Sequence, residues 1–480
     1  MSKAYSIARI NKDQKFDGQF YFAVKTTGVF CRPSCPSPVA KEENVEYYQT
    51  VFDAIGKGYR PCLRCRPDIY TDRIGYRIDA QETIQAVLDL IHDGFLNEHS
   101  VGDLADQVAI SERHLRKLFA KEVGISPVKL AKYQRAVFAK HLLLSSNLSM
   151  THVAFAAGFG SISQFNHVFQ EFFAMSPREL KRTNSIGVNK VDKGNTMTIP
   201  YKGDIRYDEV LAFMSPRLIE GVEYIDRGRY VRTFRIGEHK GHFAVENNKA
   251  KSQLELQVFA DNLTVYKEVY YRVKRMFDVD TDLGAIQDHF SQDPWIGQVA
   301  VPRLPVAFDP YEFVIRAILG QVVSIKAATT LAARIAQKAN VPYKTKDEGL
   351  WLLFPTLEEV APLDLSDIGT TKTKRATIAN VNHALLTGSL HLTSNQTYED
   401  FVKDFTAIRG IGDWTANYMA MRGLGMADAF PADDLWVKKF FAEGESKRTK
   451  RQILDIAKSW KPYRAYGTLS LWAKEAENVL

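Results

Sequence analysis

The chain has 480 residues, of which 45% are hydrophobic and 25% are charged, and its formal net charge is +7. This length predicts about three domains, and the composition is that of globular proteins with packed cores. The sequence contains no apolar run of about 18 residues, and its first residues lack the apolar core of a signal peptide. We therefore expect neither a membrane segment nor secretion, and we place the protein in the cytoplasm.

The positive charge is concentrated in the first 190 residues. They hold 25 Lys and Arg against 19 Asp and Glu, a net charge of +6, whereas residues 191–480 hold 38 against 37, a net charge of +1. A basic excess favours a nucleic-acid partner, although an excess of this size is weak support by itself.

All four cysteines lie within residues 31–65, in two closely spaced pairs. Three residues separate Cys31 from Cys35, two separate Cys62 from Cys65, and 26 lie between the pairs. Such clustering in a cytosolic chain indicates a metal site rather than disulfides. The two pairs can place four sulfurs tetrahedrally around one Zn²⁺. Because the surrounding domain is small, zinc would supply much of its folding energy.

Residues 22–37 (FAVKTTGVFCRPSCPS), with ENVEYY and GYRPCLRCRPD further along, resemble the N-terminal domain of the Ada-type adaptive-response proteins. The resemblance implies that Cys31 is both a zinc ligand and the acceptor of a methyl group from a methylphosphotriester in DNA. It makes Cys35, Cys62 and Cys65 the remaining ligands. The alternative is a structural zinc site in which Cys31 is a plain ligand.

Charge explains how such a methylation could switch DNA binding. A zinc-bound cysteine stays a thiolate at neutral pH and can attack an activated methyl group. Methylating one thiolate removes one negative charge from the site, which lowers its repulsion toward DNA phosphate. Arg60, Arg64 and Arg66 flank the second cysteine pair and are either contacts to the phosphate backbone or ordinary solvated side chains.

Two helix-turn-helix units are predicted next. The first unit consists of residues 100–109 and a serine-capped helix at 111–119. The second unit consists of residues 153–159 and a capped helix at 161–169. The apolar segment 135–146 joins them.

These units, with GF, SQFN, VFQ, FF and MSP in the second, resemble the AraC-type DNA-binding domain. The alternative is a helical spacer. The resemblance implies that six residues of the two reading helices face the major groove: Glu112, Arg113, Arg116, Ser163, Gln164 and His167.

The polar, aperiodic segment 184–196 is the expected linker. Before it we expect a zinc domain over residues 1–76 and a helix-turn-helix domain over 80–183. After it, alternating segments predict an antiparallel sheet subdomain over 197–285, and helical periods predict an all-α domain over 286–480. The predicted fold class is therefore multidomain α+β, with a small α/β zinc domain, an all-α double helix-turn-helix domain, a sheet subdomain and a final helical domain.

The segment 408–437 has the features of a phosphate-binding hairpin followed by a reactive carboxylate. Gly410 and Gly412 can expose backbone amides at the start of a helix, which is a favourable position for an anion. An aromatic helix from Trp414 follows, and the pair Asp433-Asp434 lies further on. The alternatives are a tight turn for the glycines and helix capping for the aspartates.

In order, RAILGQVVS, this hairpin, PADD and WKPYRAYGTLSLW resemble the 3-methyladenine DNA glycosylase II (AlkA-type) family of the helix-hairpin-helix superfamily. The resemblance runs from about residue 197 to the end. It implies that Asp434 is catalytic, and helix capping stays the open alternative for Asp433. It also implies that the hairpin glycines hold a DNA phosphate, with room for a monovalent cation. The pocket for the base would be lined by Trp414, Tyr418 and Trp472, and Val322 would fill the gap left by the flipped nucleotide.

The chemistry of alkylated bases explains these residue types. A base must leave the duplex to be reached, at a cost of a few kcal/mol, and an apolar wedge offsets part of that cost. Purines alkylated at N3 or N7 are cationic, so aromatic faces attract them. Because a cationic base is already a good leaving group, one carboxylate can suffice.

Several residues depart from the family pattern, and they bear on the wedge, the base pocket and the activities to be expected. Val322 is shorter than the usual Leu, and Leu435 stands where an aromatic pocket residue can occur. Trp414 occupies the position of the Schiff-base lysine of bifunctional relatives, so no lyase step is expected. No cysteine follows Cys65, so no iron–sulfur cluster is expected. No Pro-Cys-His run occurs, so an O6-methylguanine transferase half is not expected.

We interpret the chain as a bacterial, nucleoid-associated alkylation-response protein, in which a methyl-sensing transcription activator precedes a monofunctional glycosylase. Its expected partners are alkylated and promoter DNA, with RNA polymerase as a further partner, and we expect a monomer. Two alternatives remain: a glycosylase with a merely tethering N-terminal half, and a transcription factor with an inactive glycosylase domain.

Overall fold

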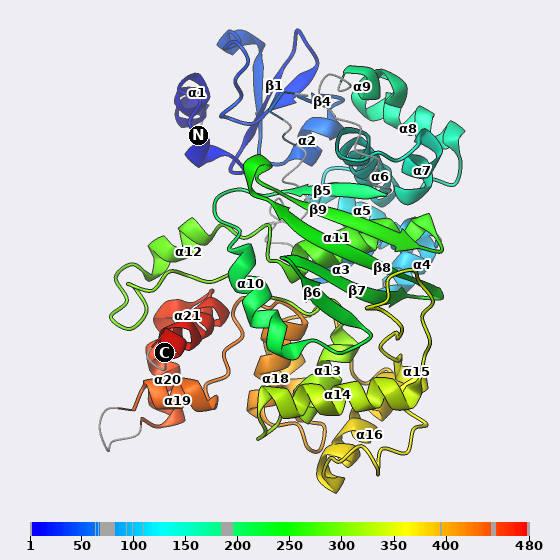
Figure 1. Cartoon of the computed structure of the whole chain (residues 1–480). Coiled ribbons are helices and arrows are strands. Elements are labelled where there is room, and N and C mark those ends of the chain that lie inside the picture. The colour runs from blue at the N-terminus through cyan, green and yellow to red at the C-terminus, as the bar shows by residue number, and fades with distance from the viewer. Residues whose placement is uncertain are drawn as a thin grey trace. The chain divides into compact units, whose positions relative to one another are not determined.

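The computed structural model describes residues 2–62, 64, 65, 67, 82–92, 94–97, 99–108, 110–183, 195–393, 396–442 and 448–477. The chain divides into two compact units, Met1–Gly194 and Asn195–Leu480 (Figure 1). No helix in these ranges is long and apolar enough to cross a membrane. The predicted domain boundaries stay predictions, and most of the expected linker lies outside the described residues.

The first part of the N-terminal unit is a four-stranded sheet in the order β3-β1-β2-β4. Strand β1 pairs antiparallel with β2 and β3, and β2 pairs parallel with β4. The chain turns between β1 and β2 at Gly28 (φ 63°). The elements are α1 (Ser2–Ile10), β1 (Tyr21–Val24), β2 (Val29–Cys31), β3 (Val45–Tyr48), α2 (Val51–Gly56) and β4 (Arg60–Pro61).

The second part is all helical, and serine caps define most of its helix starts. Ser100, Ser111, Ser126, Ser149 and Ser161 each accept a hydrogen bond from a backbone N–H of the first turn. The helices are α3 (Glu82–His92), α4 (Val101–Gln107), α5 (Glu112–Glu122), α6 (Pro127–Ser145), α7 (Met150–Ala156), α8 (Ile162–Phe173) and α9 (Pro177–Thr183). Helix α6 packs against α7, α8 and α9, as the apolar joining segment predicted.

The C-terminal unit begins with an antiparallel five-stranded sheet in the order β5-β9-β8-β7-β6 (Figure 1). Its strands are β5 (Thr196–Pro200), β6 (Glu223–Asp226), β7 (Arg229–Ile236), β8 (His239–Asn248) and β9 (Gln253–Ala260). Helix α11 (Tyr266–Met276) packs against β9. The periodicity did not predict helix α10 (Tyr207–Met214), which lies between the first two strands.

The rest of this unit is helical around one large apolar core. The long helical region at 311–339 is broken into two helices at residues 320–324. The helices are α12 (Leu283–Phe290), α13 (Pro310–Leu319), α14 (Ile325–Ala339), α15 (Leu357–Val360), α16 (Lys372–Leu386), α17 (Tyr398–Thr406), α18 (Asp413–Tyr418), a π-helix (Met419–Gly423), α19 (Leu435–Phe440), α20 (Lys450–Ile456) and α21 (Arg464–Glu477). The fold class expected from the sequence is confirmed.

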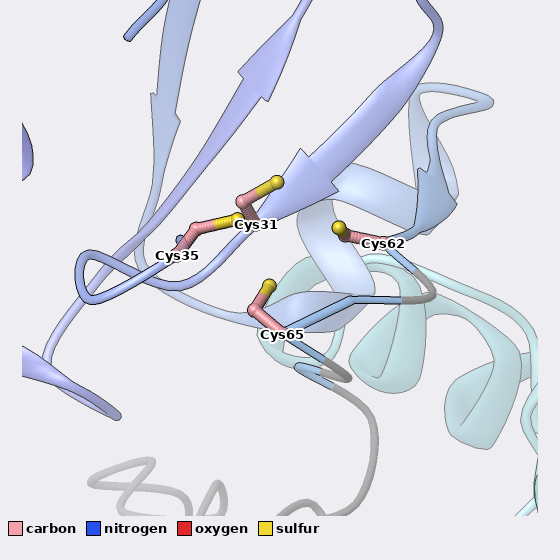
Figure 2. A group of neighbouring side chains, drawn as sticks. All are labelled: Cys31, Cys35, Cys62 and Cys65. Carbon is pink, nitrogen blue, oxygen red and sulfur yellow. The ribbon is translucent and has the colours of Figure 1, made fainter. Parts of the chain in front are cut away.

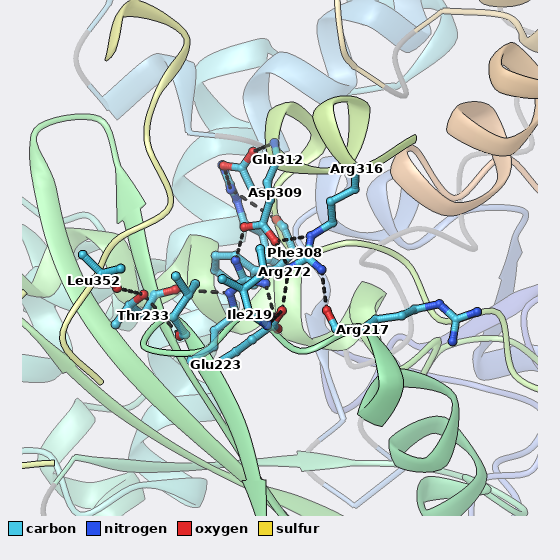
Figure 3. A network of polar contacts seen from close by, with 12 residues as sticks. Arg217, Ile219, Glu223, Thr233, Arg272, Phe308, Asp309, Glu312, Arg316 and Leu352 are labelled. Atoms are coloured by element: carbon cyan, nitrogen blue, oxygen red, sulfur yellow. Dashed lines mark hydrogen bonds and ion pairs between the residues drawn. The ribbon is translucent and has the colours of Figure 1, made fainter. Parts of the chain in front are cut away.

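A buried ion network joins the sheet to helix α13 (Figure 3). Arg232 of β7 pairs with Glu223 of β6 at 3.4 Å and with Glu312 of α13. Arg316 of α13 pairs with Glu223 and Glu312 at 2.5 Å each. Because buried charges are costly without partners, this network fixes the orientation of α13. The loop at 320–324 follows directly from that helix.

Candidate functional site

Asp434 lies at the N-cap of α19 and is only 6% exposed. Its Oδ1 accepts hydrogen bonds from the backbone amides of Trp436 (3.0 Å) and Val437 (3.2 Å). Indole Nε1 of Trp472 also donates to Oδ1 at 3.1 Å, and Nε1 of Trp414 donates to Oδ2 at 2.8 Å. The structure therefore brings the predicted catalytic carboxylate and two predicted pocket residues together.

Asp433 differs from Asp434 in its partners. Its carboxylate pairs with Lys438 at 2.7 Å and with Lys450 at 2.8 Å. Burial opposes ionisation, but hydrogen bonds from the two lysines lower the pKa of Asp433. In the described part of the chain no ion pair involves Asp434, so its charge is held by neutral N–H donors alone.

Helix capping, the alternative left open for the aspartate pair, is performed by Asp434 and not by Asp433. The turn after Pro431 brings the Asp434 carboxylate to the first amides of α19, where a cap is favourable. Capping and reactivity are therefore not alternatives at Asp434. The cap holds one oxygen and leaves the other to the indole of Trp414.

The three predicted pocket aromatics form one cluster. The rings of Trp414 and Tyr418 stack at 5.0 Å with an interplanar angle of 18°. Tyr418 also lies 6.3 Å from Trp472 and 5.2 Å from Phe313 of α13. The sequence did not single out Phe313. Phe313 lies eight residues before Gln321, and no local sequence pattern marks it as a pocket residue. Only the packing of α13 brings its ring to Tyr418.

The hairpin is a tight turn whose first glycine is sterically required. Gly410 has φ 101°, and a Cβ there would come within 2.0 Å of Thr377 Oγ1. Gly412 is exposed and caps α18, with no atom within 4 Å of an added Cβ. The side chain of Gln321 reaches this hairpin, because its Nε2 donates to Gly410 O at 3.2 Å and to Thr415 Oγ1 at 3.0 Å. The loop with the predicted wedge and the hairpin are thus directly connected.

Val322 projects from the α13–α14 loop and is fully exposed, with a relative exposure of 103%. Its φ is +55°, a left-handed conformation that is strained for a β-branched residue. The neighbouring Val323 and Ile325 are also exposed. On α19, Leu435 is 74% exposed, so the residue that replaces the expected aromatic is not packed in a pocket.

The helix-turn-helix residues lie on the two reading helices and are exposed. On α5, Arg116 pairs with Glu112 at 2.6 Å, one turn away, and Arg113 is also exposed. On α8, Ser163 and His167 are exposed, and Gln164 Oε1 accepts a hydrogen bond from Gly160 N at 3.1 Å. Leu115 and Phe165 bury the opposite faces of these helices. Each helix therefore presents a polar surface.

The four cysteines form one buried cluster in which the four Sγ atoms all lie within 4.8 Å of one another (Figure 2). Hydrogen bonds with the other thiols, that of Cys35 first, and burial raise the pKa of Cys31. Without a metal ion a thiolate is therefore disfavoured at Cys31, whereas contacts within the cluster lower the pKa of Cys35 and of Cys62. A closed set of four soft sulfur donors fits Zn²⁺, whose charge would stabilise the thiolates.

The turn between Cys31 and Cys35 is fixed by Asp17. Its carboxylate accepts hydrogen bonds from Ser34 N at 3.0 Å and Ser34 Oγ at 2.6 Å, and Arg32 pairs with it at 3.2 Å. The sequence gave no signal for Asp17, which lies outside the cysteine motif. Of the arginines by the second pair, Arg60 is half-buried and Arg64 is exposed, whereas Arg66 lies outside the described residues.

Three family models match this chain: the metal binding domain of Ada over residues 4–68, a helix-turn-helix domain over 104–183, and the AlkA N-terminal domain over 196–309. The probable bifunctional transcriptional activator/DNA repair enzyme AlkA of Mycobacterium tuberculosis is 32% identical, covering 96% of this chain and 94% of that protein. DNA-3-methyladenine glycosylase 2 of Escherichia coli is 30% identical, covering 58% of this chain and 97% of that protein. The solved 3-methyladenine DNA-glycosylase from Archaeoglobus fulgidus has a TM-score of 0.51 and 17% identity, over 58% of this chain and 98% of that one, a likeness of fold alone.

Proposed function

Because the chain belongs to the family of bifunctional Ada- and AlkA-type transcriptional activators and DNA repair enzymes, we propose that it both repairs alkylated DNA and regulates the response to that damage. The resemblances identified from the sequence are confirmed by the matching families. The C-terminal unit is a 3-methyladenine DNA glycosylase, and the N-terminal unit is a zinc-dependent methyl acceptor and DNA-binding activator.

In the glycosylase, a base flipped out of the duplex enters the cluster of Trp414, Tyr418 and Trp472. The aromatic faces attract its positive charge, each by roughly 0.5–2 kcal/mol. As the bond from the sugar to the base nitrogen breaks, its electron pair leaves with the base and neutralises it. Asp434 stabilises the positive charge that develops on the sugar, or orients the water that attacks it. The supporting observation is that Trp414 and Trp472 both donate to the Asp434 carboxylate.

The hairpin amides of Gly410 and Gly412 hold a DNA phosphate, with or without a monovalent cation, while Val322 enters the gap in the base stack. The connection of Gln321 to Gly410 supports this arrangement, because it joins the two DNA contacts. No lyase step follows, since Trp414 stands where a Schiff-base lysine would be required.

Replacing Asp434 by Asn tests the glycosylase assignment. Asn can still cap α19 but carries no charge, so we expect release of 3-methyladenine from alkylated DNA to be lost while DNA binding persists. Asp433→Asn is the matched control and should retain most of the release, because Asp433 is already paired with two lysines. Undiminished release by the Asp434→Asn protein would refute the assignment.

In the zinc domain, the thiolate of Cys31 attacks the methyl carbon of a methylphosphotriester. The carbon–oxygen bond breaks, the phosphodiester leaves with the electron pair, and Cys31 becomes a thioether. Bound zinc supplies the charge that keeps the cysteines as thiolates. The close cluster of four buried sulfurs supports this proposal.

The mass of the intact protein tests this second activity. Incubation with methylated DNA should add one methyl group at Cys31, located by peptide mapping, and Cys31→Ser should abolish the increase. An unchanged wild-type mass would leave the zinc site with a structural role only.

Methylation then strengthens promoter binding through α5 and α8, and we propose RNA polymerase as the partner of the bound protein. Exposed Arg113, Arg116, Gln164 and His167 would contact the major groove. We propose a cytoplasmic, nucleoid-associated monomer with domains over residues 1–76, 80–183, 197–285 and 286–480.

A further inference from the structure

Lys450, the first residue of α20, connects two parts of the candidate DNA-binding surface. Its Nζ lies 2.8 Å from Asp433 Oδ2 and also pairs with Asp413 Oδ2. Asp413 begins α18, directly after Gly412 of the hairpin, and Asp433 directly precedes Asp434. Asp413 lies 37 positions before Lys450 and Asp433 lies 17 positions before it, and no sequence motif relates either aspartate to the lysine.

Asp413 is in an unfavourable place for a protein that binds phosphate. Its carboxylate is 52% exposed at the start of α18, beside the amides proposed to face the DNA backbone. An unpaired carboxylate there would repel the phosphate and compete for the same N–H donors. Asp433 is 30% exposed and adds a second negative charge.

Lys450 compensates for both charges. It is 39% exposed, and its ion pairs with Asp413 and Asp433 are made from one ammonium group. Lys438 pairs with Asp433 from the other side at 2.7 Å, so Asp433 has a second cation, whereas Asp413 has no other ion-pair partner among the described residues. Loss of Lys450 would therefore expose Asp413 above all.

We infer that Lys450 is a positioning residue for DNA binding, which neutralises Asp413 so that the hairpin can accept a phosphate. This inference rests on the proposed glycosylase function. It distinguishes Lys450 from a lysine that contacts DNA itself. If Lys450 contacted DNA directly, its removal would weaken DNA binding whatever residue occupies position 413. If Lys450 neutralises Asp413, its removal weakens DNA binding only while Asp413 is charged.

The experiment is a double-mutant cycle in the full-length protein with zinc bound. Lys450→Ala, Asp413→Asn and the double variant are compared for affinity to a short duplex with one tetrahydrofuran abasic analogue. Lys450→Ala should bind about fivefold more weakly at low salt. Adding Asp413→Asn to the Lys450→Ala protein should bring its DNA affinity back to that of wild type. In the wild-type background, Asp413→Asn should change the affinity less than about twofold.

The matched control is Lys458→Ala, which removes the same charge from a lysine that pairs at 2.8 Å with exposed Asp455. Its affinity should stay within about twofold of wild type. The rate of base release from alkylated DNA at saturating protein should also be unchanged in Lys450→Ala, because Asp434 keeps all its partners. A lower melting temperature that Asp413→Asn does not correct would instead indicate a structural role and overturn the inference.

Additive effects of the two substitutions, or wild-type affinity of Lys450→Ala, would also overturn it. Failure of the glycosylase assignment gives a different result, since the wild-type protein would then release no alkylated base.

Discussion

Indole Nε1 of Trp414 donates a 2.8 Å hydrogen bond to Oδ2 of Asp434, while the face of the same indole stacks on Tyr418 at 5.0 Å. One side chain thus donates to the carboxylate with its edge and contributes its face to the proposed base pocket. Because stacking fixes the ring, it also fixes the direction of the N–H. The pocket and the carboxylate are therefore a single arrangement, and a change in one should affect the other.

Trp414→Phe separates these two contributions. Phe keeps an aromatic face next to Tyr418 but cannot donate to Asp434. Loss of one hydrogen bond to a charged group is worth about 1.5–3 kcal/mol, so we expect the maximal rate of base release to fall by roughly tenfold or more. The half-saturating protein concentration should change little. Single-turnover release with excess protein measures both quantities.

Trp414→Ala provides the comparison, because it removes the face as well. It should also weaken binding of the alkylated base. If the Phe variant releases base at the wild-type rate, the indole N–H has no role in the reaction.

Val322→Gly should slow base release without lowering the stability of the C-terminal unit. A left-handed Val costs of order 1–3 kcal/mol, and Gly removes that strain while adding about 1 kcal/mol of unfolded-chain entropy. We expect the stability of the C-terminal unit to stay the same or rise by up to about 2 kcal/mol, because the lost side chain is fully exposed and makes no packing contribution. Base release should slow, because no wedge remains to fill the stack.

Urea unfolding followed by tryptophan fluorescence measures this stability, because all six tryptophans lie in the C-terminal unit. The control is Val323→Gly in the same loop, where no positive φ is relieved and a loss of stability is expected. Equal destabilisation by both substitutions would show that Val322 stores no strain.

Local patterns predicted much of this fold, since strand alternation, helical period and serine caps act over a few residues. The hairpin at Gly410 and the four-cysteine cluster were both predicted from such short patterns. Helix α10 was missed because it lies in a short segment between strands. The π-helix at Met419–Gly423 was likewise read as a continuation of the helix from Trp414.

Polar contacts between distant segments could not be predicted. Glu312 meets Arg232 across 80 positions, and Lys450 meets Asp413 across 37. Neither pair has a period or spacing that distinguishes it from the other charged residues of the sequence. Which of Asp433 and Asp434 caps α19 could not be predicted for the same reason, because only the folded turn shows which carboxylate reaches the amides of that helix.

Zinc removal should affect the N-terminal unit alone. All four cysteines belong to the cluster, so a thiol-modifying reagent should release one zinc ion for every four thiols that react. Methyl acceptance should be lost, whereas base release and tryptophan fluorescence should be unchanged, because the C-terminal unit has its own core. Zinc measured by a colorimetric chelator, together with a release assay, checks this. Parallel loss of zinc and of base release would contradict it.

Asp278 should make the C-terminal unit less stable as the pH rises. Burial raises the pKa of this carboxyl to about 6, against 3.8 as the ordinary value, although Leu304 N and Tyr466 OH donate to it at 3.0 Å each. The folded state therefore binds the proton more tightly than the unfolded state, so stability falls between about pH 4 and pH 6 and stays reduced above that range. A shift of this size corresponds to about 3 kcal/mol.

The side chain of Asn in the Asp278→Asn variant cannot ionise. Any change in the unfolding free energy that comes from altered hydrogen bonds of this side chain is therefore the same at every pH. Relative to wild type, the variant should therefore gain up to about 3 kcal/mol of unfolding free energy between pH 4 and pH 7, measured by tryptophan fluorescence in urea. Asp455→Asn is the control, because the hydrogen bond from Lys458 lowers the pKa of Asp455 below its ordinary value of 3.8. That variant should lose relative stability as the pH rises only below about pH 4, so between pH 4 and pH 7 its curve should run parallel to that of wild type. If the curves for wild type and Asp278→Asn run parallel, Asp278 is not protonated at low pH in the folded protein, and the buried carboxylate is held ionised by its hydrogen bonds.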